Sequence, residues 1–276
     1  MESPELILLV AFGACYVVAT VAYIAFLVGR VKAAALLGTA FLLLGLAAQT
    51  GALAFRGVKE GRLPLANGYE MVSCTVWGIG IVYAVLEFRQ KQRQLGAFVL
   101  PIMVVLSMLA WHWRRGIEVN LLPALQNPFW LYTHVTTAIL AYGGFGVAFA
   151  LGLGYLLVSR QQAKAQQGFL ASRLPSLEWM DVHTYKIITF AFIFQTLVIV
   201  TGAIWAESAW GRNWSWDPKE VWSLITWLVY AVYLHCRLAR GWRGVRAAWV
   251  NVIGFAVVLF TFIGTNLLPG LHSYGR

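Results

Sequence analysis

A tryptophan-rich stretch is the part of the sequence whose residue types and spacing best suit a chemical role. Residues 205–227 hold six of the chain's thirteen tryptophans, namely Trp205, Trp210, Trp214, Trp216, Trp222 and Trp227. Tryptophan is common at the headgroup level of a bilayer, but such a belt needs only one or two residues at each helix end. Four tryptophans within residues 205–216 favour instead a platform of aromatic faces for a flat, apolar ligand.

Charged residues stand beside this aromatic stretch. Arg212 and Lys219 could bind carboxylates, so the expected ligand is flat and apolar with a negatively charged edge. Haem, which carries two propionates, has this shape. The run Asp217-Pro218-Lys219-Glu220 also predicts a helix start, with Asp at the N-cap, Pro at the first helical position and Glu at the third. That local role explains the run itself but not the tryptophans before it.

Five histidines are the candidate ligands for an iron. Taken alone, His134 and His272 are each more typical of an interfacial histidine, but both are expected at the level of the tryptophan stretch. Two neutral imidazoles from different helices can hold haem iron from both sides. His112, between two tryptophans, is a rival that this reasoning leaves open. His235 lies within an apolar run and is a functional candidate for that reason, with a solvated histidine as the alternative. His183 is expected to be a surface residue.

The composition shows what kind of elements must position these residues. The chain is 60% hydrophobic and 12% charged, whereas soluble domains are about 45–50% apolar and about 25% charged. About 20 apolar residues cross a bilayer, and such runs occur at about 6–28, 33–55, 69–88, 95–113, 130–158, 185–205, 219–239 and 247–268. We therefore expect an all-α, polytopic membrane bundle of about eight transmembrane helices, forming a single domain over residues 1–276. The longest stretch between these runs, about 159–184, is polar.

Lysine and arginine divide unevenly between the two ends of this expected bundle. Thirteen of the 21 fall at the end that holds the connections after the first, third, fifth and seventh runs, and eight fall at the other. The positive-inside rule assigns the richer end to the cytoplasm. Both termini and the 205–219 loop are then expected outside. Because the basic residues form no single patch, the expected partner is the lipid bilayer and not nucleic acid.

The three cysteines, Cys15, Cys74 and Cys236, lie in apolar runs and form no C-x-x-C pair. A thiol in such surroundings behaves as a small hydrophobic group. The pattern predicts no disulfide framework, no zinc site and no metal other than a haem iron. Any thiol chemistry would therefore take place on a partner.

The stretch from Trp210 to Glu220, followed by Trp222 to Trp227, resembles the tryptophan-rich (WWD) signature of haem-handling proteins. More closely, it resembles the CcsA (ResC) family of System II cytochrome c biogenesis proteins. Supporting matches follow in the family's order: Asn67-Gly68-Tyr69-Glu70, His134 within residues 131–135, Tyr233-Leu234-His235, and residues 270–274 around His272. The resemblance covers roughly residues 60–276, and the first two runs match only in hydrophobicity.

The resemblance implies a role for each matched residue. His134 and His272 would be the external axial ligands of haem, and His235 a ligand within the membrane whose opposite ligand comes from the partner subunit CcsB (ResB). Arg212 and Lys219 are candidates for propionate contacts. The haem platform would comprise Trp205, Trp210, Gly211, Trp214, Trp216, Asp217 and Pro218. Asn67, Tyr69 and Glu70 are weaker candidates, for which helix capping or packing is an equal alternative. His112 is also a weaker candidate, as the rival ligand.

The resemblance also implies an activity. Haem b (iron protoporphyrin IX) would be a transported substrate, moved from the membrane or cytoplasmic side to the external site. With CcsB, the chain would support attachment of its vinyl groups to the thiols of C-x-x-C-H motifs in apocytochrome c, as the haem-presenting subunit of a holocytochrome c synthase. A thioredoxin-like pathway would act indirectly by reducing those thiols. A bacterial plasma membrane is expected, with a thylakoid membrane as the alternative.

Two other functions stay open. A b-type membrane cytochrome would carry electrons on a permanent haem, and it would need paired histidines on facing helices inside the bilayer. A haem exporter would deliver haem outside without ligating it. His134 and His272 are expected at the outer edge and His235 stands alone, which disfavours the first function. The sequence does not separate the second from a synthase subunit.

Overall fold

The computed structural model describes residues 4–114, 127–164 and 168–270. These residues form eight long helices, each long and apolar enough to cross a membrane. They are α1 (Pro4–Gly29), α2 (Lys32–Glu60), α3 (Gly68–Gln90), α4 (Gly96–Trp113), α5 (Pro128–Ala163), α6 (Leu177–Trp210), α7 (Pro218–Arg240) and α8 (Val245–Phe262). Two short 3-10 helices, η1 (Arg93–Leu95) and η4 (Gly264–Leu267), complete the described elements. The prediction of an all-α, multi-pass membrane bundle is confirmed.

Local sequence signals explain where several helices begin and end. Side-chain oxygens cap the first turns of α3, α5, α6 and α7, from Asn67, Asn127, Ser176 and Asp217 respectively. Such a cap satisfies an otherwise unpaired amide at the helix start. Left-handed residues end α2, α3, α6 and α7, at Gly61, Lys91, Gly211 and Gly241. Glycine adopts this conformation without strain, so three of these four ends are encoded by a glycine.

The predicted boundaries of two helices were too short. α5 has 36 residues and α6 has 34, so both are about 50 Å long at 1.5 Å per residue and exceed a hydrocarbon core of about 30 Å. Much of the polar 159–184 stretch, expected as a connection, therefore belongs to these helices. His183 lies inside α6, half-buried, with its ring stacked on Trp179 at 3.7 Å. The apolar runs record only the part of a helix that meets lipid.

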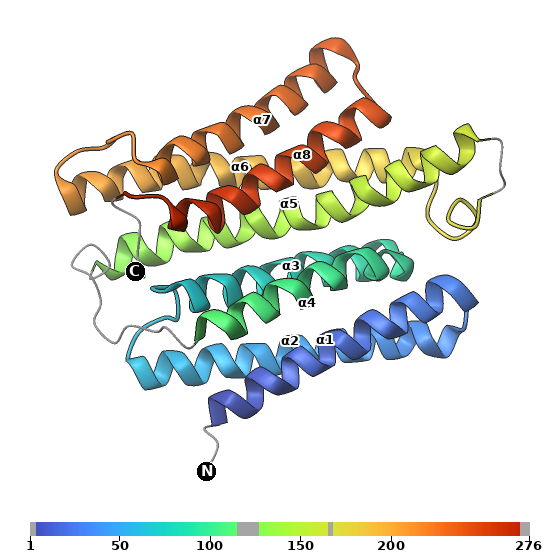
Figure 1. Cartoon of the computed structure of the whole chain (residues 1–276), viewed down its shortest axis with the longest axis horizontal. Helices are drawn as coiled ribbons and strands as arrows, with labels where there is room; N and C mark the ends of the chain where they lie inside the picture. Colours follow the sequence, from blue (N-terminus) through green and yellow to red (C-terminus); the bar gives the residue numbers. More distant parts are fainter. Residues whose placement is uncertain (1–3, 115–126, 165–167, 271–276) are drawn as a thin grey trace.

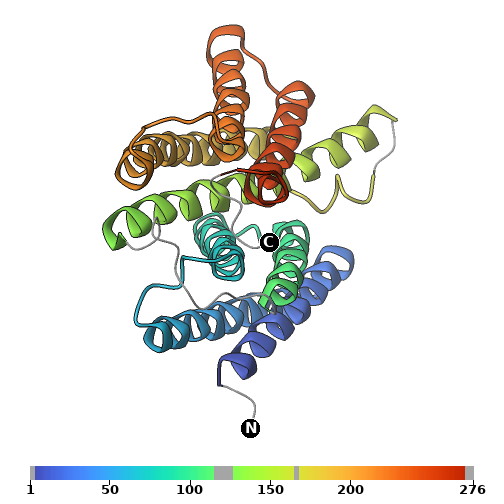
Figure 2. The ribbon, with the colours of Figure 1, turned by 60° about the vertical axis from the view of Figure 1, so that its left-hand side comes forward.

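The helices form two groups that meet at α3 and α5 (Figures 1 and 2). α1 packs on α2 and α4, α3 packs on α4 and α5, and α5 packs on α6 and α8. Gly78 and Gly143 allow the close approach of α3 and α5, because a Cβ atom on Gly143 would come within 2.9 Å of the Gly78 backbone. Small residues serve the same purpose in other membrane bundles.

Successive helices alternate in direction, so the starts of α1, α3, α5 and α7 lie at one end of the bundle, on the left in Figure 1. The turn between α6 and α7 lies at this end, which we call the tryptophan-loop end. Pro4 and Gly270, where the described residues begin and finish, also lie there. That this end faces the outside stays a prediction of the positive-inside rule.

A buried ionic cluster holds the turn between α2 and α3 at the tryptophan-loop end. Glu70 is fully buried and accepts hydrogen bonds from Arg56 at 2.5 Å, Arg62 at 2.8 Å and the Ala66 amide at 2.7 Å. Arg56 also donates to Glu5 of α1 at 3.1 Å. Charges removed from water are tolerated only when they are paired in this way.

We expect Glu70→Ala to destabilise the protein by about 3–5 kcal/mol, because it leaves two arginines at an apolar site without their shared carboxylate. Lys59→Ala is the matched control, since the Lys59 side chain is 57% exposed and lies 4.0 Å from Glu5. This control should change stability by no more than about 0.5 kcal/mol. Thermal unfolding of the two detergent-purified variants measures the difference, and equal midpoints would contradict a structural role for the cluster.

Candidate functional site

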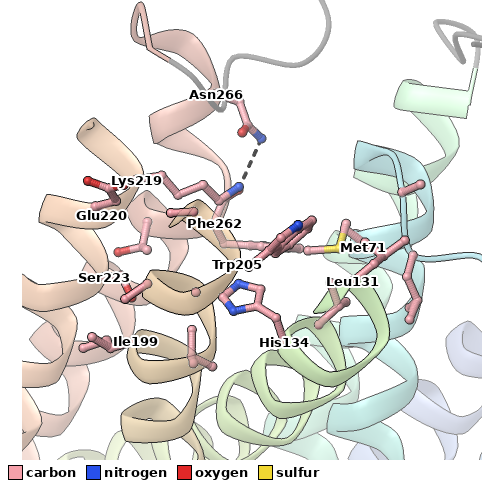
Figure 3. Close-up of a pocket in the computed structure, with 18 of the residues that line it drawn as sticks. Met71, Leu131, His134, Ile199, Trp205, Lys219, Glu220, Ser223, Phe262 and Asn266 are labelled. Carbon is pink, nitrogen blue, oxygen red and sulfur yellow. Dashed lines mark hydrogen bonds between the residues drawn. The ribbon is translucent and has the colours of Figure 1, made fainter. Parts of the chain in front are cut away.

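A cavity opens at the tryptophan-loop end, between α3, α5, α6 and α7 (Figure 3). Its volume is about 150 Å³. Both apolar and polar side chains line it. Its aromatic, charged and hydrogen-bonding residues are Asn67, Trp113, His134, Tyr142, Trp205, Trp210, Asn213, Trp214, Lys219, Glu220, Ser223, Thr261, Phe262 and Asn266. Residues far apart in the sequence therefore meet in one cavity, which we call the outer pocket.

α6 forms a seat for the imidazole of His134 in the outer pocket. Nδ1 of His134 lies 3.2 Å from the Thr201 hydroxyl. The ring of Trp205 is tilted against the imidazole at 5.5 Å. Gly202 leaves room for the ring, because a Cβ atom there would come 2.9 Å from His134 Cε1. The position and plane of this histidine are thus set by three residues of one helix.

The hydrogen bonds of Thr201 favour one tautomer of His134. The hydroxyl donates to the Leu197 carbonyl at 2.6 Å. Because a hydroxyl has a single hydrogen to donate, its oxygen accepts from Nδ1 of His134. In the neutral ring Nε2 is then the nitrogen that carries a lone pair. This is the arrangement of metal-binding histidines, whose second nitrogen donates to a neighbouring group.

The loop between α6 and α7 is held by carboxylates. Glu220 accepts from the amides of Ser215 at 2.8 Å and Asp217 at 3.2 Å, which completes the predicted capping box at the start of α7. The rings of Trp214 and Trp216 meet edge to face at 5.9 Å. Trp216 has a left-handed backbone (φ 61°) and is 74% exposed. The loop thus points one tryptophan into the outer pocket and one out of it.

Only some of the residues predicted to form the haem platform line the outer pocket. Trp205, Trp210 and Trp214 line the outer pocket. Asp217 and Pro218 form the helix cap, Gly211 ends α6 with a φ of 71°, and Trp216 lies outside the cavity lining. Of the two candidate propionate contacts, Lys219 lines the cavity and points toward Asn266 in Figure 3, whereas Arg212 is exposed.

The weaker candidates are divided in the same way. Asn67 lines the outer pocket and caps α3 by accepting from the Glu70 amide at 2.9 Å. Tyr69 is buried beneath the Arg56 guanidinium, 5.2 Å from the ring centre, and Glu70 belongs to the ionic cluster. His112 is exposed, and its neighbour Trp113 lines the cavity instead.

The remaining two histidines are not placed in the outer pocket. His235 is exposed on α7, 16 residues after Lys219 and thus about 24 Å along the helix. It shares its exposed face with Leu228 and Val232. His272 lies outside the described residues; the described chain ends at Gly270, where an added Cβ atom would overlap the Asp217 carboxylate.

Several pocket residues were missed by reasoning from the sequence. Ser223 lies one turn after Lys219 on α7, so helical spacing could have found it. Trp113 is adjacent to a histidine that was considered. Met71, Tyr142, Thr261 and Asn266 look like ordinary bundle residues, and only the packing of α3, α5 and α8 against α6 brings them to the cavity.

We expect Glu220→Ala to loosen the tryptophan loop, because it removes the acceptor for two loop amides. The exposed Arg212 gives a readout, since trypsin should cut after it faster in the variant than in the wild type. Glu178→Ala is the matched control, as Glu178 is an exposed carboxylate in the first turn of α6. Equal cleavage rates in all three proteins would show that the loop does not depend on Glu220.

Comparisons with known proteins agree with one another. The family model described as cytochrome C assembly protein matches residues 65–272. The chain is 37% identical to the cytochrome c biogenesis protein CcsA of Guillardia theta, covering 81% of this chain and 80% of the relative. It is 32% identical to CcsA of Gloeobacter violaceus, covering 96% and 94% of the two chains.

A solved structure shares the fold. The chain superposes on a cytochrome c haem lyase, CcmF, with a TM-score of 0.63 at 16% identity, covering 97% of this chain and 46% of that one. This likeness concerns the arrangement of the helices alone. The sequence relatives go further: the chain belongs to the CcsA family and is a multi-pass membrane protein of cytochrome c biogenesis.

Proposed function

We propose that the chain binds haem b as a substrate at the outer pocket and presents it for covalent attachment to apocytochrome c. The observation that carries this proposal is the seat of His134, which fixes an imidazole in a cavity lined by four tryptophans and a lysine. The tryptophans suit the porphyrin plane. Lys219 suits a propionate, since it is the basic residue among those described that line the cavity.

The size of the outer pocket indicates how haem would be held. Sites that enclose a ligand of cofactor size measure roughly 300–1,000 Å³, whereas this cavity measures about 150 Å³. The pocket would therefore grip one part of the macrocycle and leave another edge outside, near the exposed Trp216. An exposed edge is what ligation needs, because the vinyl groups must meet thiols of another protein.

The proposed reaction requires positioning more than acid or base groups. Each thiol adds across a vinyl double bond, so sulfur and hydrogen both remain in the product and no group leaves. The reactive groups belong to haem and to the C-x-x-C-H substrate. The contribution of this chain would be orientation, which is worth several kcal/mol when two reactants are held correctly.

A partner chain is part of the proposal. His235 lies on an exposed, apolar face of α7 and about 24 Å from the start of the outer pocket, so it cannot bind the same haem as His134. An ionisable residue on such a face is expected to meet a partner. We propose that a CcsB-type subunit covers this face and supplies the second ligand to a haem in transit, with its thiol-reducing pathway acting on the substrate.

The two alternatives are less well supported. A b-type cytochrome needs two histidines facing each other inside the bilayer, whereas His134 and His235 lie near opposite ends of the bundle. A haem exporter would use the same pocket but would release the haem outside without taking part in its attachment to apocytochrome c. The relatives include cyanobacterial and plastid proteins; we propose a bacterial plasma membrane with the outer pocket on the external face.

The absorption spectrum of the complex with its CcsB partner tests the outer haem site. We expect the wild type to carry low-spin haem with two histidine ligands, and His134→Ala and His272→Ala each to alter that spectrum and abolish apocytochrome maturation. The reason is that each variant removes one axial ligand.

Two controls make this result specific. His183→Ala, at the other end of α6, should leave both spectrum and maturation unchanged. His112→Ala tests the rival ligand. If the His134 and His272 variants leave the spectrum unchanged and the His112 variant alters it, the haem ligand is His112 and the proposed ligands are wrong. If the His134 and His272 variants still deliver haem to the outside, and the partner still attaches it to apocytochrome c, the chain is a haem exporter that does not take part in ligation.

A second prediction concerns Thr201, whose hydroxyl accepts from Nδ1 of His134. Thr201→Val keeps the shape but removes the acceptor, so we expect haem to be retained about 10–100-fold less tightly. The midpoint potential should also rise, because an imidazole that loses this hydrogen bond is a weaker electron donor. Thr201→Ser keeps the hydroxyl, so its haem retention and midpoint potential should match those of the wild type. Identical potentials in all three proteins would mean that Thr201 only packs against the ring.

A further inference from the structure

The buried face of α7 is polar, the reverse of what a helix in a soluble protein shows. Throughout α7, all of which is described, the fully buried residues are Thr226, Tyr230 and Tyr233. Leu228 and Val232 are instead 47% and 51% exposed. With their neighbours one turn away, the buried residues form a line at helical spacing, which we call the α7 stripe: Lys219, Ser223, Thr226, Tyr230, Tyr233 and Arg237.

The upper part of the α7 stripe begins in the outer pocket. Ser223 lines that cavity and accepts a hydrogen bond from Gln195 of α6 at 3.1 Å. One turn further, the Thr226 hydroxyl lies 2.8 Å from the hydroxyl of Thr261 on α8. Thr261 also lines the outer pocket. Polar contacts thus lead from the cavity into the bundle.

The middle of the α7 stripe contains polar atoms that the protein leaves unsatisfied. The Tyr230 hydroxyl and Asn251 Oδ1 are buried and have no hydrogen-bond partner within residues 4–114, 127–164 and 168–270. Both lie where α7 meets α8, since the Tyr230 hydroxyl would be 3.1 Å from a Cβ atom on Gly254, one turn after Asn251. Gln195 Oε1 is unsatisfied in the same way.

The lower part ends in a second, smaller cavity. Tyr233, Tyr155, Asp181 and Thr184 are among the residues that line this space of about 10 Å³. That volume is about the smallest that holds one water molecule. Arg237 closes the end by donating to both carboxylate oxygens of Asp181, at 3.0 and 2.5 Å.

We propose that the α7 stripe is a hydrated route along which protons pass between the outer pocket and the opposite end of the bundle. Buried polar groups in a bilayer are expensive unless they are paired or hydrated, and lines of them mark ion and proton paths. Water that bridges Tyr230 and Asn251 would satisfy both orphan atoms and join the two cavities. The route would serve His134, Lys219 and Glu220 at one end and Asp181 and Arg237 at the other.

The packing limits this route to water and protons. Tyr230 is stacked on Phe145 at 3.8 Å with an angle of 8°. A Cβ atom on Gly152 would meet Asn251 Nδ2 at 2.5 Å. There is no room for a porphyrin here, so the route is separate from the path of haem. At the stack a proton must pass through the Tyr230 hydroxyl, which makes this residue the narrowest point.

Hydroxyl-radical footprinting by X-ray radiolysis of the purified protein tests the hydration. Radicals formed from bound water should oxidise Tyr230 and Tyr233, although both are buried. Tyr16 and Tyr23 are the matched controls, because they are equally buried but donate to Gln49 and Glu87, each at 2.6 Å. Labelling of Tyr230 no greater than that of Tyr16 would overturn the proposal.

Proton flux into proteoliposomes, driven by a potassium diffusion potential and read by a trapped pH dye, tests the conduction. The wild type should exceed protein-free vesicles, and Tyr230→Phe should fall to their level because it removes only the hydroxyl. Tyr16→Phe should behave as the wild type. A wild-type flux equal to that of empty vesicles, or unchanged in Tyr230→Phe, would overturn the route. Neither readout uses haem, so the result is independent of the proposed haem function.

Discussion

The close approach of α5 and α6 is the contact on which the site depends. Gly144 and Ala191 meet so tightly that a Cβ atom on Gly144 would lie 2.8 Å from that of Ala191. Nearer the tryptophan-loop end, Gly202 lies directly beneath the ring of His134. Larger residues at these positions would separate the helices, and a separation of even 1 Å would break the 3.2 Å contact between His134 and Thr201. The packing of α5 against α6 therefore determines the position of the His134 imidazole.

The bilayer explains where the polar residues of this bundle lie. With no water in the hydrocarbon core, polar side chains are placed inside and apolar ones outside. In the ionic cluster around Glu70, the buried carboxylate is paired with two arginines and a backbone amide. The α7 stripe has no such ion pair at its middle, where Tyr230 and its neighbours Gln195 and Asn251 each keep a buried polar atom with no partner among the described residues. The paired charges of the Glu70 cluster suit a rigid turn, whereas the unsatisfied groups of the α7 stripe suit the passage of water and protons.

The sequence predicted the membrane class, the eight helices and the start of α7, because these follow from composition and from local capping. The ends of α5 and α6 were misjudged because polar residues continue a helix beyond the lipid without changing its geometry. His134, Trp214 and Lys219 were predicted as ligand, platform and propionate contact from residue type and the resemblance, and all three line the outer pocket. The distinction between His112 and Trp113 was beyond such reasoning, since one residue of helix rotation, about 100°, decides which side chain meets the cavity.

The lining of the outer pocket shows why a single sequence motif could not describe it. The tryptophan signature supplies three walls, while Asn67, Trp113 and His134 come from helices that begin or end more than 70 residues earlier. Those helices reach the pocket because the Glu70 cluster holds the turn before α3, and because Gly78 and Gly143 bring α3 against α5. The signature is therefore only half of a site, and the buried charges of α2 and α3 hold the other half in place. A cavity built across both groups of helices would change shape whenever the α3–α5 contact moved, which couples the grip on a ligand to the packing at the centre of the bundle.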